Sequence, residues 1–235
     1  MIPVIQKGDL ADINVQSEGF ILLIDKPAGW TSFDVVKKLR GFLKIKKVGH
    51  AGTLDPFATG LLIAGIGKAT KKLSHYSNLC KRYDAEITFG QERDTYDVTG
   101  KIVEEMKTDQ LQEGDIKQAL EKMTGSLLQE PPMYSAKKVN GVPLYKRARR
   151  NEVVERPKNA VTIYEVYLID WQNPVARIQM KVSKGTYVRA YAHDIGRELG
   201  NRAYVSALRR TQIGRYEVQN SFTINQFMDY WKNLN

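Results

Sequence analysis

One carboxylate lies in a stretch of the chain whose composition could serve catalysis. The stretch reads Gly49-His50-Ala51-Gly52-Thr53-Leu54-Asp55-Pro56-Phe57-Ala58-Thr59-Gly60. Gly and Pro at this density predict a specially shaped loop rather than a regular helix or strand. The apolar run 61–66 that follows predicts a buried strand, and polar groups on loops anchored in this way are often catalytic. Asp before Pro is also a common turn former, so spacing alone favours a structural role for Asp55.

Other kinds of catalytic centre are not indicated by the sequence. The three histidines, His50, His75 and His193, are far apart and lack partners at metal-ligand spacing. Cys80 is the only cysteine, which argues against a zinc site and excludes an intrachain disulfide. No phosphate-binding loop or dinucleotide-type glycine pattern occurs, so no nucleotide cofactor is expected.

The charge balance narrows the class of partner. Lys and Arg number 36 against 26 Asp and Glu, which gives a formal net charge of +10 and a pI near 9.5. Such an excess of positive charge favours binding to a polyanion, most often nucleic acid, although basic proteins without such a partner are common. Residues 1–16 contain no apolar core of signal-peptide length, and no apolar run is long enough to span a membrane. With one cysteine, a soluble cytoplasmic protein is the simplest expectation.

Apolar periodicity predicts the elements that must position these residues. In the first half of the chain we expect a strand over 19–26, a helix capped by Thr31 or Ser32, a strand over 83–89 and a polar turn over 91–99. In the second half we expect a helix over 115–123, antiparallel strands over 161–171 and 176–183, a helix capped by Thr186 that ends at Gly200, and a final helix capped by Thr223. Strands and helices do not alternate regularly, which favours the α+β class.

The segment 131–155 differs from the rest of the chain. It is long, begins with two prolines, and interleaves six Lys or Arg side chains with Tyr134 and Tyr145. Long segments of this kind in compact domains are usually functional or mobile. Basic side chains contact phosphates and aromatic rings stack on bases, so RNA contact is favoured modestly over a solvated loop.

Six segments, in order along residues 19–217, resemble the motifs of the bacterial tRNA pseudouridine synthase B (TruB) family. The Gly-rich stretch 49–60 resembles the catalytic motif of that family. The other five are Leu23-Ile24-Asp25-Lys26-Pro27, Lys81-Arg82-Tyr83, Pro131-Pro132-Met133-Tyr134-Ser135-Ala136-Lys137-Lys138, Ser183-Lys184-Gly185-Thr186-Tyr187-Val188-Arg189, and Leu208-Arg209-Arg210. One such motif would be weak, but six collinear ones make the resemblance specific.

The resemblance implies an activity and a fold. The activity is isomerisation of uridine to pseudouridine at position 55 in the T-loop of tRNA. The fold is a central mixed, mostly antiparallel sheet flanked by helices and loops, without metal or organic cofactor. Because the target base is stacked inside an RNA loop, it must first be flipped into a pocket. Asp55 matches the catalytic aspartate, which acts either as a nucleophile or by removing a sugar proton to give a glycal.

The resemblance also assigns roles to further residues. Arg189 matches the basic partner that keeps the aspartate ionised; without the family it reads as a surface Arg on a helix. Tyr83 matches the tyrosine that stacks on the target base near C5, Leu208 a wall of the uracil pocket, and His50 the residue that enters the RNA. Without the family, Tyr83 and Leu208 read as core residues and His50 as a local hydrogen-bond partner.

The remaining assignments concern support and binding. Lys26 and Pro27 are expected to support the active-site loop, and Tyr187 to pack beside the pocket. The segment 131–155 corresponds to the thumb that closes on the RNA, where the expected contacts are Lys137, Lys138, Arg149 and Arg150. We expect one catalytic domain over 1–235 that binds the T-arm as a monomer, without a protein partner. The family commonly adds a C-terminal RNA-binding module, for which 19 residues after Tyr216 are too few.

Two alternatives remain at this point. The chain could be a non-catalytic protein that binds or folds tRNA on the same scaffold, although such a protein would not need Asp55, Tyr83 and Arg189 together. It could also be a synthase for a different RNA uridine, because pocket residues alone do not read a whole RNA.

Overall fold

A computed structural model describes residues 2–8, 19–150, 152 and 154–234 of the chain. The chain divides into two compact units. Unit 1 takes in residues 1–83 and 208–235, and unit 2 takes in residues 84–207. Strands β5 (Lys81–Phe89) and β13 (Ala203–Ile213) contribute residues to both units. None of the helices that the structure describes combines the length and apolar character needed to cross a membrane.

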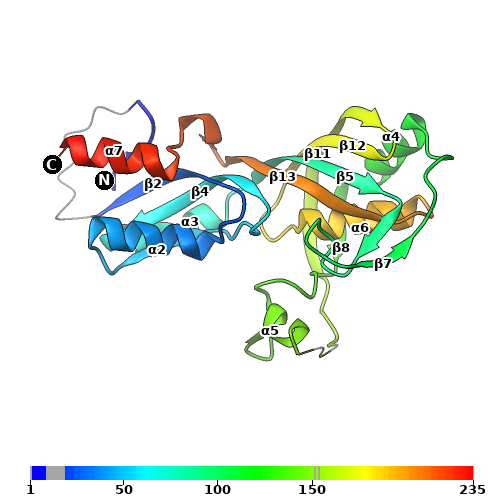
Figure 1. Ribbon diagram of the computed structural model, residues 1–235, viewed down its shortest axis with the longest axis horizontal. Coiled ribbons are helices and arrows are strands. Elements are labelled where there is room, and N and C mark those ends of the chain that lie inside the picture. Colours follow the sequence, from blue (N-terminus) through cyan, green and yellow to red (C-terminus); the bar gives the residue numbers. More distant parts are fainter. Residues whose placement is uncertain (1, 9–18, 151, 153, 235) are drawn as a thin grey trace. The chain divides into compact units, whose positions relative to one another are not determined.

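Unit 1 is built on a sheet with the strand order β1-β2-β4-β13 (Figure 1). The strands are β1 (Val4–Ile5), β2 (Phe20–Lys26), β3 (Val48–Ala51), β4 (Thr59–Ile66) and β14 (Tyr216–Glu217). β2 and β3 both pair antiparallel with β4, whereas β13 pairs with β4 in parallel. The helices are α2 (Ser32–Leu43), η1 (Gly67–Lys72), α3 (Leu73–Ser77), η2 (Val218–Asn220) and α7 (Ile224–Leu234).

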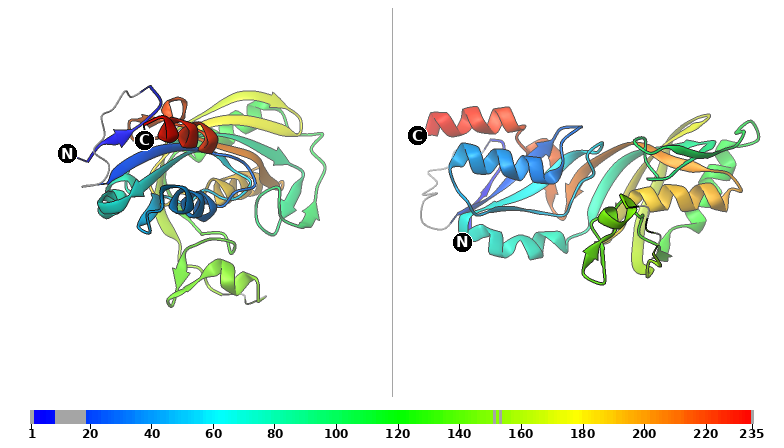
Figure 2. Two further views of the ribbon diagram at one scale, coloured as in Figure 1. Left: turned by 60° about the vertical axis from the view of Figure 1, so that its left-hand side comes forward. Right: turned by 60° about the horizontal axis from the view of Figure 1, so that its bottom comes forward.

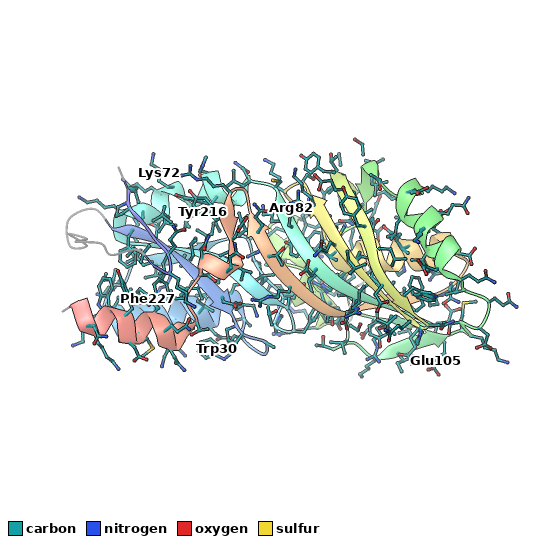
Figure 3. All side chains as sticks on the ribbon, turned by 90° about the horizontal axis from the view of Figure 1, so that it is seen from above. Trp30, Lys72, Arg82, Glu105, Tyr216 and Phe227 are labelled. Carbon is teal, nitrogen blue, oxygen red and sulfur yellow. The ribbon has the colours of Figure 1, made fainter. Side chains whose placement is uncertain are left out.

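Helices cover both faces of this sheet, which explains why β2 and β4 are apolar almost throughout. Successive strand residues point to opposite faces. Phe20, Leu22 and Ile24 therefore share one core cluster with α2 and with Phe227 of α7, whereas Ile21 and Leu23 belong to the cluster on the η1 and α3 side. Figure 2 shows α2 and α7 on one side of the strands and α3 on the other, and Figure 3 marks Phe227. The motif that carries Asp55 is thus attached to a fully packed layer.

The expected capping of α2 is confirmed. Thr31 is the N-cap: its hydroxyl accepts a hydrogen bond from the Asp34 amide at 3.0 Å, and the Asp34 carboxylate accepts from the Thr31 amide at 2.9 Å. This reciprocal pair satisfies two amides at the start of the helix. The strands expected over 19–26 and 61–66 and the helix capped by Thr223 are also confirmed.

One expectation for the Gly-rich stretch is wrong. Its first residues lie in β3 and its last two in β4, so only residues 52–58 are irregular. Gly49 pairs with Gly65 across the two strands. A Cβ at either position would lie 3.0 Å from the Leu73 side chain. These glycines serve close packing of α3 against a regular sheet, which their composition alone does not distinguish from a loop.

Unit 2 contains a sheet with the order β13-β5-β12-β11-β8, in which β11 pairs antiparallel with both of its neighbours. Its strands are β8 (Gly125–Gln129), β11 (Asn159–Gln172) and β12 (Val175–Val182), with a hairpin of β6 (Gln91–Arg93) and β7 (Ile102–Glu105). The helices α4 (Glu113–Lys122) and α6 (Val188–Glu198) contact each other, and α4 packs on β11. The α+β class is confirmed.

Two local expectations in unit 2 are wrong. The polar turn expected over 91–99 begins with a strand, β6, which pairs with β7. The sequence did not predict this strand because no alternation of apolar residues marks it. Thr186 does not cap α6: the N-cap is Tyr187, and no side chain caps the helix there. The Thr186 hydroxyl instead donates to the Ser183 carbonyl at 3.0 Å, within the turn that precedes the helix. The expected strands and the helices α4 and α6 are otherwise confirmed within two residues.

The thumb segment (residues 131–155) projects from unit 2 in Figure 1, where its helix α5 (Leu144–Ala148) is labelled. It also contains the short strands β9 (Lys138–Val139) and β10 (Val142–Pro143). Leu144 is fully buried and Ala148 nearly so, which gives the segment a small apolar contact of its own. Residues 151 and 153 of this segment lie outside the described part of the chain.

Candidate active site

Asp55 lies in the loop that leads from β3 to β4 in unit 1. Its carbonyl accepts a hydrogen bond from the Ala58 amide at 3.2 Å, which closes a turn over Asp55-Pro56-Phe57-Ala58. Leu54 and Ala58 are buried on either side, whereas Asp55 itself is half-buried. The loop therefore holds a carboxylate at the surface between two buried residues, within a turn of the kind that Asp before Pro predicts.

Lys26, at the end of β2, supports this loop from one side. Its side chain is fully buried, and its Nζ donates to the carbonyls of Pro27 at 2.9 Å, Trp30 at 2.7 Å and Pro56 at 3.4 Å. An ammonium has three donors, and here three carbonyls accept them. The Pro56 carbonyl also accepts from the Gly29 amide at 2.8 Å. The residue after Asp55 is thus tied by Lys26 to the turn after β2.

Arg210, in β13, holds the loop from the other side. The side chain is 1% exposed, and its guanidinium donates to the carbonyls of Leu61 at 2.7 Å, Gly52 at 3.1 Å and Thr53 at 3.5 Å. Gly60 pairs with Arg210 and has a φ of +105°. A Cβ on Gly60 would lie 2.3 Å from the Arg210 carbonyl oxygen. Only glycine permits this close approach, which lets one arginine join β4 to the catalytic loop.

The charges around Asp55 act on its neighbours. Burial lowers the pKa of Lys26 from 10.5 to about 8, opposed by the Asp55 carboxylate and reinforced by the Arg210 guanidinium. The pKa of His50 is lowered by burial and by Arg210, while a hydrogen bond with the Gly52 backbone raises it. His50 is therefore neutral at pH 7. The site combines one carboxylate, two buried cations and a neutral imidazole within unit 1.

Arg189 is not a surface side chain. It lies in the first turn of α6 in unit 2 with 3% of its side chain exposed, and it forms an ion pair with Asp97 at 3.2 Å. Its guanidinium also donates to the carbonyls of Thr95 at 2.8 Å and Tyr134 at 2.9 Å. A buried guanidinium held by a carboxylate and two carbonyls has a fixed direction. The solvated alternative for Arg189 is therefore wrong.

Asp97 is a site residue that the sequence reasoning missed. Its carboxylate accepts hydrogen bonds from the hydroxyls of Thr95 at 2.9 Å and Thr99 at 2.5 Å and from the Thr99 amide at 2.9 Å. The Thr-x-Asp-x-Thr spacing could have indicated such a carboxylate-centred turn. The sequence alone does not single out Asp97, because it lies in the segment 91–99, whose composition indicates only a polar turn.

Outside the thumb segment, the remaining expected site residues are Tyr83 and Leu208, which belong to unit 1, and Tyr187, which belongs to unit 2. Tyr83 on β5 and Leu208 on β13 are each 8% exposed. Tyr187 precedes α6, and its amide and carbonyl both bond the Gln129 side chain, at 2.7 and 3.0 Å. The structure thus brings Asp55, Lys26, His50 and Arg210 together in unit 1, and fixes Arg189 and Tyr187 in unit 2.

The four expected contact residues of the thumb segment differ in exposure. Lys138, Arg149 and Arg150 are exposed, whereas Lys137 is half-buried and donates to the Asn159 side chain at 2.5 Å. The guanidinium of Arg149 lies 5.6 Å from the ring centroid of Tyr145. Three of the four side chains are therefore exposed to solvent, as contact with a polyanion requires.

One stretch of unit 1 has a large excess of positive charge. Residues 35–83 contain eleven Lys or Arg side chains and a single acidic one, Asp55, so this stretch alone carries +10, the formal net charge of the whole chain. Exposed lysines lie on α2, on the turn after it and on η1, where Figure 3 marks Lys72. A carboxylate within a stretch that has this excess of Lys and Arg is compatible with a substrate that has a phosphate backbone.

Comparison with known proteins agrees with this geometry. A family model described as TruB family pseudouridylate synthase (N terminal domain) matches residues 40–188, and one described as tRNA pseudouridylate synthase B C-terminal domain matches residues 189–234. The tRNA pseudouridine synthase B of Fusobacterium nucleatum is 45% identical over 199 residues, which cover 85% of this chain and 69% of the relative. That of Ureaplasma urealyticum is 42% identical over 218 residues, which cover 92% of this chain and 95% of the relative.

Solved structures share the fold. A chain in the crystal structure of a Cbf5-Nop10-Gar1 complex superposes with a TM-score of 0.71 at 27% identity and covers 91% of this chain. A chain in the structure of an H/ACA RNP bound to a substrate RNA gives a TM-score of 0.68 at 24% identity. The present chain spans about half the length of these solved chains, 54% and 53% respectively.

Proposed function

The chain belongs to the TruB family of pseudouridine synthases, and on this basis we propose that it isomerises uridine to pseudouridine at position 55, in the T-loop of tRNA. Relatives named tRNA pseudouridine synthase B support the reaction and the tRNA substrate. The observation that carries the proposal is the setting of Asp55. It is the single carboxylate of a strongly basic stretch, on a loop held by buried side chains on both sides.

The reaction rearranges one bond without changing the composition of the RNA. The glycosidic bond between C1′ and N1 breaks, the uracil turns within the pocket, and C5 bonds to C1′. The proton on C5 then leaves, and N1 takes up a proton, so the product is an isomer. Asp55 acts on the sugar, either by attack on C1′ or by removal of a sugar proton that gives a glycal. In both routes the carboxylate must be ionised and must be held near the ribose.

For the other expected site residues we propose the roles that the family resemblance implies. Arg189 orients and stabilises the ionised Asp55. Tyr83 stacks on the uracil, and its hydroxyl lies where the C5 proton must leave. Leu208 forms a wall of the uracil pocket, Tyr187 packs beside it, and His50, uncharged at pH 7, enters the RNA beside the flipped base. Lys26 keeps the loop in place.

We propose that the T-arm is the part of tRNA that the protein binds, as one catalytic domain that works as a monomer in the cytoplasm. The thumb segment closes on the T-arm through the phosphate contacts of Lys137, Lys138, Arg149 and Arg150. The basic stretch 35–83 adds a sequence-independent attraction, since each neutralised phosphate releases counterions. Support comes from the exposure of three of the four thumb residues and from the charge of that stretch.

The test is to incubate the protein with an unmodified tRNA transcript and to map pseudouridine by carbodiimide-dependent stops of primer extension. A new stop at position 55 is the expected result. Pseudouridine at another position only would assign a different uridine. Tight tRNA binding without any pseudouridine would instead make the chain a tRNA-binding protein on a synthase scaffold.

A further inference from the structure

Ser32, the first residue of α2, bonds the residue that precedes Asp55. Its hydroxyl accepts a hydrogen bond from the Leu54 amide at 2.8 Å and donates to the Leu54 carbonyl at 3.1 Å. Ser32 is 2% exposed and Leu54 is 3% exposed, so water does not replace either bond. A serine hydroxyl has one proton to donate and lone pairs to accept, so both bonds form at once.

These two bonds fix the peptide planes on both sides of Leu54. The amide belongs to the plane shared with Thr53, and the carbonyl belongs to the plane shared with Asp55. Planes of this kind are rigid, so the orientation of the second one sets where the Asp55 backbone begins. Arg210 holds the Gly52 and Thr53 carbonyls before this point, and Lys26 holds the Pro56 carbonyl after it. Of these three side chains, Ser32 is the one that bonds a carbonyl in the peptide plane that Asp55 shares with Leu54.

The hydroxyl of Ser32 is not needed for the helix that carries it. Thr31 and Asp34 form the complete capping box of α2. Val35, Val36 and Leu39 of α2 are buried in the core of unit 1, so Ser32 is fixed to a rigid element. A serine at the first position of a helix commonly serves the helix end. Here that task is already performed, and the hydroxyl is directed to the catalytic loop.

We propose that Ser32 is a positioning residue for the reaction, which holds the Asp55 carboxylate in its reactive place by clamping Leu54 from α2. The inference rests on the proposed function, because it assigns the clamp to the Asp55 chemistry. A reacting group displaced by about 1 Å can lose about 10²-fold in rate, even though every catalytic side chain is present. Loss of the two Ser32–Leu54 hydrogen bonds should therefore slow the chemical step and leave the affinity for RNA unchanged.

The experiment measures single turnovers with enzyme in excess over a full-length tRNA transcript that carries tritium at C5 of its uridines. Release of tritium reports loss of the C5 proton. For Ser32→Ala the limiting rate constant should fall by about 10- to 100-fold, while the enzyme concentration that gives half of that rate should change by less than about threefold. A smaller folded fraction would raise the enzyme concentration that gives half of the limiting rate and would leave the limiting rate constant unchanged. Partial unfolding is thus distinguished from a slower chemical step.

Ser221→Ala is the matched control. Ser221 is also a buried serine of unit 1, 6% exposed, and its hydroxyl bonds the Val218 carbonyl at 2.5 Å, in the turn between β14 and α7. This variant should keep the wild-type limiting rate. Ser32→Cys, whose thiol fills nearly the same space but bonds weakly, should also be slow, and it replaces Ser32→Ala if that variant does not fold.

Three results would overturn or separate the claims. A wild-type limiting rate in a folded Ser32 variant overturns the proposal, and so does an equal loss in Ser221→Ala. If the wild-type protein releases no tritium, the proposed function itself is wrong. The wild type alone gives that result, so it is distinguished from a failure of the Ser32 proposal.

Discussion

Removal of the buried Lys26 ammonium should change how the stability of the protein depends on pH. Burial holds the pKa of Lys26 at about 8 in the folded state, against 10.5 for a solvated lysine. Below pH 8 both the folded and the unfolded chain carry the proton, and the full cost of burying the cation is present. Between pH 8 and 10.5 the folded chain loses the proton first, so the unfolded state binds more protons and stability rises with pH.

The increase in the free energy of unfolding follows from the difference between the folded and unfolded pKa values of Lys26. The interval from 10.5 to about 8 corresponds to about 3.4 kcal/mol, at 1.36 kcal/mol per pKa unit. Activity should move in the opposite direction over the same window. A neutral amine has two N–H donors, whereas three carbonyls, including that of Pro56, accept bonds from Lys26. The catalytic loop should thus be held less firmly just as the fold gains stability.

The assay compares urea unfolding of the wild type and Lys26→Met at intervals from pH 7 to 10.5. The wild type should gain up to about 3.4 kcal/mol relative to Lys26→Met as pH rises through the window. Lys72→Met, which removes an exposed lysine of the same unit, is the control, and its difference from the wild type should stay constant. A wild-type minus Lys26→Met difference that does not change with pH would refute the reasoning.

Three further predictions concern the chemistry and the RNA. Asp55→Asn should abolish pseudouridine formation and leave tRNA affinity within about a few fold, because phosphate contacts supply most of the binding; a near-normal rate would contradict the role of Asp55. Replacing Lys137, Lys138, Arg149 and Arg150 together by Ala should flatten the log–log dependence of affinity on salt by about 0.7 for each phosphate contact that is lost; an unchanged slope would mean that the thumb segment does not touch phosphates. Tyr83→Phe should bind tRNA normally in a filter assay and react about 10²–10⁴-fold more slowly, because it keeps the ring and loses the hydroxyl. If Tyr83→Phe reacts as fast as the wild type, the tyrosine is only a stacking platform.

Elements with a strong local signal could be predicted from the sequence. The β2 and β4 strands are apolar runs of strand length, and the alternation in β5 marks a strand with one wet face. The capping box of α2 is a signal within four residues. Such features depend on neighbours along the chain, and sequence reasoning reads them directly. Asp55 was found because its loop has an unusual composition, and its role came from the family resemblance.

Features that depend on distant neighbours could not be predicted. Arg210 carries a charge and is nevertheless 1% exposed, because it bonds the carbonyls of Gly52 and Leu61, which are about 150 positions away in the sequence. Ser32 reads as a possible helix cap, and only the fold directs its hydroxyl to Leu54. The pairing of Asp97 with Arg189 joins residues 92 positions apart. Buried polar side chains look like surface ones until their partners are known.

The division of the chain has a consequence for the order in which a ribosome-bound chain folds. The first 83 residues of unit 1 lack β13 and α7, which supply Ile213 and Phe227 to its two cores. Synthesis from residue 83 to residue 213 takes about 7 to 26 s at about 5 to 20 residues per second. Unit 2 is complete at residue 207 and can fold first. The Asp55 loop, which Arg210 holds, is therefore assembled among the last parts of the nascent protein, because Arg210 is synthesised only after the last residue of unit 2.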